Sequence, residues 1–133
     1  MHVRLNSAAP TFLVADVGAT IRWYEERFGF KSYPFPEQPP YVFASIVREG
    51  VEIMLMRLEG YRKPDLRSQR PAGLWDAYIR MDGVTRFYEQ VREHVTILRP
   101  PTKQRYGDTE FEVMDPNGYI LVFSELIPED KPA

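Results

Sequence analysis

The chain carries few residues that could act as nucleophiles, bases or metal ligands. It has no cysteine, which removes disulfides, thiolate nucleophiles and thiolate metal sites together. Its two histidines, His2 and His94, lie near the N-terminus and near the end of a predicted helix, where neither is well placed to act as a base. Two carboxylates, Glu52 and Asp76, could form a pair for acid–base chemistry if their pKa values were pushed apart.

The same predicted strands offer groups for binding a small molecule. Tyr78 could stack on a ring or form a hydrogen bond, and Arg80 could hold a carboxylate or phosphate with two hydrogen bonds. Met54 and Met56 suit an adaptable binding surface, although each suits ordinary packing as well. In the alternative interpretation, Asp76 and Arg80 pair with neighbouring side chains and fill the space. The predicted residues of a binding cleft are Phe43, Glu52, Met54, Met56, Asp76, Tyr78, Arg80, Tyr106 and Val122.

The first half of the chain predicts a βαβββ unit that would position these residues. A strand at 10–15 is followed by an amphipathic helix, which Asp16 can cap and Gly29 can close. Prolines in 31–36 suit an edge strand. Two alternating apolar runs within 41–57 then predict a hairpin.

The order of elements then repeats. Residues 74–126 predict a strand, a helix, a short strand and a second hairpin with a DPNG turn. Aligning Gly50 with Gly118 sets the two hairpins 68 positions apart and pairs Phe43 with Phe111. An internal repeat of half the chain indicates two copies of one unit. We therefore predict an α+β fold in which two tandem βαβββ modules form a cupped mixed sheet around a cleft.

The length of the chain suits one domain, residues 1–133, with a moderate core. We divide it into module 1 (9–57), a connecting loop (58–73), module 2 (74–126) and a frayed C-terminal tail (127–133). The connecting loop is locally basic. It could close over an anionic ligand, but we expect it to be a solvated link between the modules.

Two stretches carry a resemblance to a known family. FLVADVGATIRWYEERFGF (12–30) and FEVMDPNGYILVFSE (111–125) resemble the vicinal oxygen chelate superfamily, which includes glyoxalase I, extradiol dioxygenases, and fosfomycin and bleomycin resistance proteins. The resemblance covers nearly the whole chain and implies paired βαβββ modules around a cleft. Enzymes of this family hold a divalent metal in the cleft with His, Glu or Gln from four strands, and the metal acts as a Lewis acid.

Carried onto this chain, the resemblance places the four metal-ligand positions at Ala9, Met54, Asp76 and Val122. Alanine and valine have no donor atoms, and a thioether suits copper(I) better than Mn, Fe(II), Ni or Zn. One carboxylate cannot make a tight site, because catalytic sites generally use about three protein ligands. We therefore expect no metal and no other cofactor.

The departure from the ligand pattern leaves a chain that is similar to the bleomycin resistance branch, whose members bind a drug without metal. The resemblance thus implies a metal-free small-molecule binding protein, sequestering a drug-like or metabolite ligand in a dimeric cleft, as in antibiotic resistance. The basic connecting loop argues against cationic bleomycin as the ligand. Two alternatives stay open: a metal-dependent glyoxalase-type lyase, isomerase or dioxygenase with substituted ligands, and a dimeric regulatory domain without a ligand.

Composition narrows the choice of partners. A net charge of −2 gives no global sign of binding to nucleic acid or to an anionic membrane. No apolar run reaches the roughly 18 residues that span a bilayer, and the N-terminus lacks the apolar core of a signal peptide. We expect a cytoplasmic homodimer whose partner is a small molecule.

Overall fold

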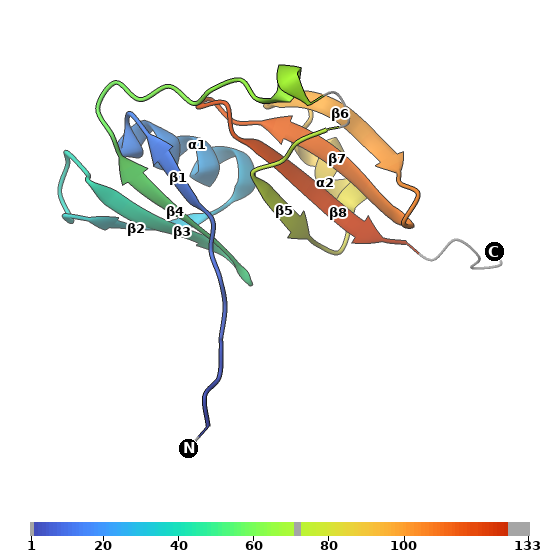
Figure 1. The fold of residues 1–133 in the computed structure, drawn as a ribbon, viewed down its shortest axis with the longest axis horizontal. Coiled ribbons are helices and arrows are strands. Elements are labelled where there is room, and N and C mark those ends of the chain that lie inside the picture. Colours follow the sequence, from blue (N-terminus) through green and yellow to red (C-terminus); the bar gives the residue numbers. More distant parts are fainter. Residues whose placement is uncertain (1, 71–72, 128–133) are drawn as a thin grey trace.

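The computed structural model of the chain describes residues 2–70 and 73–127 (Figure 1). The elements of module 1 are β1 (Thr11–Val14), α1 (Val17–Phe28), β2 (Lys31–Phe35), β3 (Phe43–Arg48) and β4 (Val51–Arg57). A short 3-10 helix, η1 (Arg67–Gln69), lies in the connecting loop. The elements of module 2 are β5 (Ala77–Arg80), α2 (Val84–Val91), β6 (Thr96–Lys103), β7 (Asp108–Met114) and β8 (Ile120–Leu126).

The strands form two four-stranded sheets with the same topology. Their orders are β1-β4-β3-β2 and β5-β8-β7-β6, and in each sheet the first pair is parallel and the other pairs are antiparallel. Figure 1 shows each helix against the far face of its own sheet, so the other face of each sheet carries no helix. The predicted α+β fold of two βαβββ modules is confirmed. No helix in the described part of the chain is long and apolar enough to cross a membrane.

Strand alternation decides which side chains enter the core. Ile53 and Leu55 of β4 and Leu121 and Phe123 of β8 are buried on the helix side, as the repeat predicts. The core is continuous between the modules. The ring of Phe28, at the end of α1, lies with its centroid 5.1 Å from that of Phe123 in module 2.

The two hairpins differ in length by one residue. Ala44 pairs with Leu55 in the first, whereas Phe111 pairs with Phe123 in the second. The alignment of Phe43 with Phe111 is therefore wrong by one position, because four residues separate the paired Val47 and Glu52, whereas five separate the equivalent pair Met114 and Ile120. Phe111 is fully buried in the core, and Phe43 lies on the opposite face of its sheet.

The DPNG turn is a rigid element that also joins the modules. The Oδ1 atom of Asp115 accepts hydrogen bonds from the backbone N–H groups of Asn117 at 2.8 Å and Tyr119 at 2.9 Å. Gly118 has φ of 91°, which glycine adopts without strain. The hydroxyl of Tyr24 in α1 donates to Asp115 Oδ2 at 2.6 Å. Burial raises the pKa of Asp115, although these hydrogen bonds act in the opposite direction.

The connecting loop is mostly exposed over residues 58–70, as expected, but two of its basic side chains contact module 2. Lys63 Nζ lies 3.4 Å from Asp76 Oδ2 and 5.5 Å from the ring centroid of Tyr119. An Arg67 guanidinium nitrogen lies 3.8 Å from Glu112 Oε1. These contacts fasten the loop to module 2 through Asp76, which the sequence analysis placed there, and Glu112, which it did not. Of the predicted C-terminal tail, residues 128–133 lie outside the described part.

Candidate functional site

The helix-free faces of the two sheets, which we predicted to line the cleft, differ in chemistry. On module 1 this face is mostly apolar. Phe43 pairs with Met56 across β3 and β4, and Ser45 pairs with Met54. The Met56 side chain is 46% exposed, and Leu13 beside it on β1 is 36% exposed. We call this surface the apolar face; its members are Leu13, Tyr33, Phe35, Phe43, Met54 and Met56.

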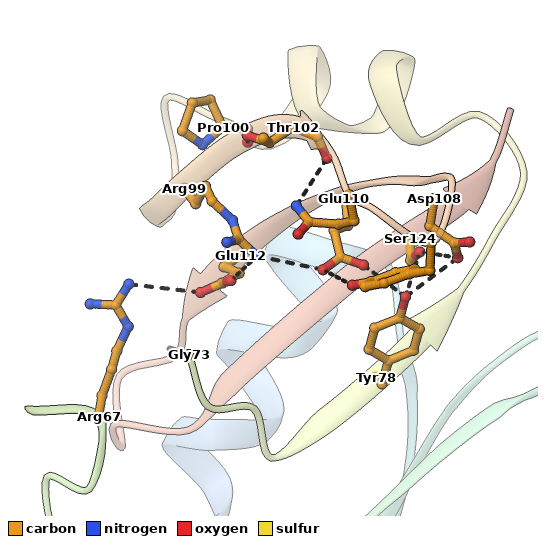
Figure 2. A network of polar contacts seen from close by, with 12 residues as sticks. Arg67, Gly73, Tyr78, Arg99, Pro100, Thr102, Asp108, Glu110, Glu112 and Ser124 are labelled. Carbon is orange, nitrogen blue, oxygen red and sulfur yellow. Dashed lines mark hydrogen bonds and ion pairs between the residues drawn. The ribbon is translucent and has the colours of Figure 1, made fainter. Parts of the chain in front are cut away.

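On module 2 the helix-free face carries a connected set of charged and hydroxyl side chains (Figure 2). Three carboxylates follow one another at alternate positions of β7, and arginines and tyrosines from other elements surround them. All three carboxylate residues are at most 5% exposed. We call this set the polar network; it comprises Arg67, Tyr78, Arg80, Arg99, Tyr106, Asp108, Glu110, Glu112 and Ser124.

Glu110 lies at the centre of the polar network. The hydroxyl of Tyr78 donates to its Oε2 at 2.7 Å, and the hydroxyl of Tyr106 donates to its Oε1 at 2.7 Å. Arg99 on β6 approaches the same Oε1 at 3.5 Å and also pairs with Glu112. These donors come from β5, β6 and the loop before β7, so the tertiary fold is needed to assemble them.

Asp108 forms the second centre. Its Oδ2 accepts hydrogen bonds from Arg80 and from the Ser124 hydroxyl, each at 2.7 Å, and Tyr78 lies at 3.4 Å. The hydrogen bond from Ser124 lowers the pKa of Asp108, and the charge of Arg80 adds to this against the opposing effect of burial. Asp108 is therefore ionised at neutral pH.

Tyr78 and Tyr106 stay protonated and act as hydrogen-bond donors rather than as bases. Burial raises the pKa of Tyr106, and the hydrogen bond to Glu110 raises it further. Burial also raises the pKa of Tyr78, although a hydrogen bond with Ser124 acts against it. Both phenols keep their protons at neutral pH. A hydroxyl that donates to Glu110 still has lone pairs with which it can accept a hydrogen bond from a ligand.

A cavity of about 470 Å³ lies between β4 and β5, beside the start of β1. It brings together four of the predicted residues, Glu52, Asp76, Tyr78 and Arg80, with Ala8 and Pro10 completing part of the wall. Its size is within the range of small-molecule pockets. Glu52 is exposed and accepts a hydrogen bond of 2.5 Å from Ser45.

The side chains at the four family metal positions do not fit a divalent metal. Ala9 and Val122 offer no donor, and Val122 is fully buried. Asp76 Oδ2 accepts the backbone N–H of Ile120 at 2.8 Å, so its carboxylate is already engaged. Among residues 2–70 and 73–127, no group of three or more His, Asp or Glu side chains has an arrangement that could hold a metal ion.

Glu125 also has a structural partner. Its Oε1 accepts hydrogen bonds from the backbone N–H groups of Gly83 and Val84, each at 2.9 Å. It therefore caps the N-terminus of α2, where the unpaired N–H groups of the first turn favour a carboxylate.

The structure distributes the nine predicted cleft residues over both faces. Phe43, Met54 and Met56 belong to the apolar face, while Tyr78, Arg80 and Tyr106 belong to the polar network. The sequence analysis missed Arg99, Asp108, Glu110 and Glu112. A signal was present: in DTEFE, Phe111 is apolar, so alternation places its acidic neighbours on the face shared with Val122 and Ser124.

Comparison with known proteins adds a family and a fold. The family described as "Glyoxalase/Bleomycin resistance protein/Dioxygenase superfamily" matches residues 4–123. Among solved structures, TioX from Micromonospora sp. ML1 is 16% identical, with a TM-score of 0.69 over 95% of this chain and 100% of that chain. A glyoxalase-related enzyme from Clostridium phytofermentans is 17% identical, with a TM-score of 0.72 over 94% and 98% of the two chains.

A bleomycin-binding protein from Streptomyces verticillus, solved with copper(II)-bleomycin, is 21% identical. Its TM-score is 0.68, over 92% of this chain and 97% of that chain. Identities at this level show the fold alone. No curated protein matches the sequence.

Proposed function

The chain belongs to the glyoxalase/bleomycin resistance protein/dioxygenase superfamily, and from this premise we propose that it binds a small molecule between its modules without a metal. It acts by sequestering a drug-like compound or metabolite rather than by converting it. The ligand contacts the apolar face with its hydrocarbon part and reaches Tyr78 and Arg80 with its polar groups.

One observation supports this proposal above the others: the four positions that hold metal in enzymatic relatives have no usable set of donors here. Ala9 and Val122 cannot ligate, and the Asp76 carboxylate is held by Ile120 N–H and Lys63. Without a metal, the tyrosines of the polar network cannot replace it as bases, because their pKa values are raised. These features support binding without chemistry over the metal-dependent alternative.

We also propose that the site is completed in a homodimer. The apolar face exposes large side chains, and large exposed apolar patches are a mark of interaction surfaces. Residues 2–8 extend away from the body of the chain (Figure 1), and Val3 and Leu5 are 90% and 94% exposed. A second copy covering both features would enclose a ligand from two sides.

The first experiment is elemental analysis of purified protein before and after incubation with Mn, Fe(II), Ni and Zn. We expect no stoichiometric metal. About one metal per chain would contradict the metal-free part of the proposal, and glyoxalase-type activity would then be assayed.

The second experiment is a thermal-shift screen with aromatic, cationic and anionic compounds, bleomycin included. A compound at about 100 times its Kd stabilises the folded state by about 2.7 kcal/mol. We expect Arg80→Gln and Met56→Asp to remove the shift given by a compound that binds wild type. Arg22→Gln, an exposed residue outside both helix-free faces, is the matched control that should retain it. A shift that survives both cleft substitutions would place binding elsewhere.

A further inference from the structure

A second cavity lies on the helix side of the molecule, away from the apolar face, and borders the cavity between β4 and β5 at Val51 and Arg80, which line both. Its volume is about 450 Å³. The turn between β3 and β4 forms one wall, and the end of β5 with the loop to α2 forms the other. We call it the helix-side groove; the residues that matter for its chemistry are Phe28, Arg48, Glu49, Val51, Asp82 and Phe87.

The floor of the helix-side groove is apolar and fixed. The rings of Phe28 and Phe87 have centroids 5.7 Å apart, and Phe123 lies within 5.2 Å of both. These residues are almost completely buried, so their positions are set by core packing. Because so little of the three rings is exposed, apolar contact with a ligand falls mainly on Val51 and Met81, which also line the groove and are partly exposed.

Arg48 places a cation over this floor. Its Nη1 donates to the backbone oxygen of Phe28 at 2.9 Å, and its Cζ lies 5.6 Å from the ring centroid of Phe87. Its Nε pairs with Glu49 at 3.2 Å. A guanidinium has more N–H donors than these contacts use. The remaining donors stay available to an anionic group that enters the groove.

The surrounding charges limit the ligand to a single negative charge. The Glu49 side chain is 82% exposed, Asp82 lines the groove, and the charge of Arg80, which lines it too, is paired with Asp108 at 2.7 Å. A dianion would meet repulsion from both acids, whereas one carboxylate can pair with Arg48 alone. We propose that the helix-side groove is a second binding site, specific for small apolar monocarboxylates, with the carboxylate on Arg48 and the hydrocarbon against Val51 and Met81.

The probe for this site is 4-phenylbutyrate, titrated into isotopically labelled protein while backbone amide resonances are followed. We expect saturable shifts at residues 28–30, 48–51 and 79–82, with Kd of about 1 mM for a ligand of this size. The neutral analogue 4-phenylbutan-1-ol should bind at least fivefold more weakly. The absence of saturation at 10 mM 4-phenylbutyrate, or shifts centred on Tyr78 and Tyr106, would overturn the proposal.

Two substitutions test the charge of Arg48 and the open space of the groove independently. Arg48→Gln should weaken 4-phenylbutyrate binding at least fivefold and leave the alcohol unchanged, whereas Arg22→Gln should affect neither. Val51→Trp should fill the groove and abolish binding of both probes with Arg48 intact. The amide spectrum of each variant reports whether the fold is kept. Equal binding of 4-phenylbutyrate by Arg48→Gln and wild type would overturn the assignment. Because Met56→Asp leaves this groove untouched, failure here is distinguishable from failure of the cleft proposal.

Discussion

The helix-free faces of modules 1 and 2 occupy equivalent positions in two copies of one unit, yet they are built in opposite ways. The apolar face holds methionine, leucine and phenylalanine side chains that are partly open to solvent. The polar network holds three carboxylates that are almost fully buried beneath arginines and tyrosines of the same chain. The two modules thus share one backbone topology, while their helix-free surfaces differ in polarity and burial.

The two helix-free faces also differ in how strongly their side chains are held in place. A buried carboxylate is stable only while its donors are in place, so the polar network fixes its own geometry and resists change. An exposed methionine has few partners, so the apolar face can adapt to whatever covers it. One face is a preorganised polar wall, and the other is an adjustable apolar wall. The cavity between β4 and β5 is lined by Tyr78 and Arg80 of the polar wall but by no residue of the apolar face. In the dimer that we propose, the two walls together would suit a ligand of mixed polarity.

Among the substitutions that test this difference between the faces, Glu110→Ala should have the largest effect on stability. The substitution leaves Tyr78, Tyr106 and Arg99 without their shared acceptor, and we expect it to lower the free energy of unfolding by about 3 kcal/mol. Urea unfolding followed by circular dichroism measures the loss. Met56→Ala, on the apolar face, is the control and should cost less than about 1 kcal/mol. A smaller loss for Glu110→Ala than for Met56→Ala would show that the network does not stabilise module 2.

Tyr106→Phe tests one donor of the network. It removes the 2.7 Å hydrogen bond to Glu110 but leaves the ring, and we expect a loss of about 1 kcal/mol in urea unfolding. Tyr33→Phe, an exposed tyrosine on the apolar face, should change the unfolding free energy by less than about 0.5 kcal/mol. Equal effects of the two substitutions would remove the distinction between the faces.

The third test uses pH. The folded-state pKa of Asp108 is below its ordinary value of 3.8, so its ionised form stabilises the folded state. That contribution is present above about pH 4 and is lost as the pH falls through the folded-state pKa. Asp108→Asn should therefore be less stable than wild type at pH 7, and the gap should narrow as the pH falls below about 4. Urea midpoints at pH 7, 5, 4 and 3 follow the gap; a constant gap would contradict the assignment.

The smallest effect on stability is expected from Met56→Asp, although its effect on assembly is large. The side chain is half exposed, so the substitution should change the unfolding free energy of one chain by less than about 0.5 kcal/mol. A charge on the apolar face should nevertheless prevent a second copy from covering it. Light scattering after size-exclusion chromatography would compare wild type, Met56→Asp and Glu59→Gln. A wild-type monomer, or a Met56→Asp dimer, would rule out this face as the interface.

The fold was predictable because its signals are local and occur twice. Helical spacing with the Asp16 cap predicted α1, and alternation in β4 and β8 placed Ile53 and Phe123 in the core. The hairpin alignment was wrong by one residue because the turn lengths differ. A glycine-to-glycine alignment cannot detect this difference when one turn contains an extra residue.

The polar network was only half predictable. Alternation in β7 could have assigned Glu110 and Glu112 to the helix-free face from the sequence. Their burial depends on covering groups that are far apart in sequence: Tyr78 on β5, Arg99 on β6 and Arg67 in the connecting loop. No local pattern reports such pairings. The same reason explains why the contacts of the connecting loop with Asp76 and Glu112 were not predicted.

Phe28 joins two duplicated modules into one cooperative unit. Its ring contacts both Phe87 and Phe123, so separating the modules would expose aromatic surface on each of them. Neither module can therefore open alone without losing part of the core that the other requires. Calorimetric and van't Hoff enthalpies of unfolding should be equal, and a separately expressed half should stay unfolded until the complementary half is added. The repeat is visible in two sheets, but we expect the chain to unfold as one cooperative unit.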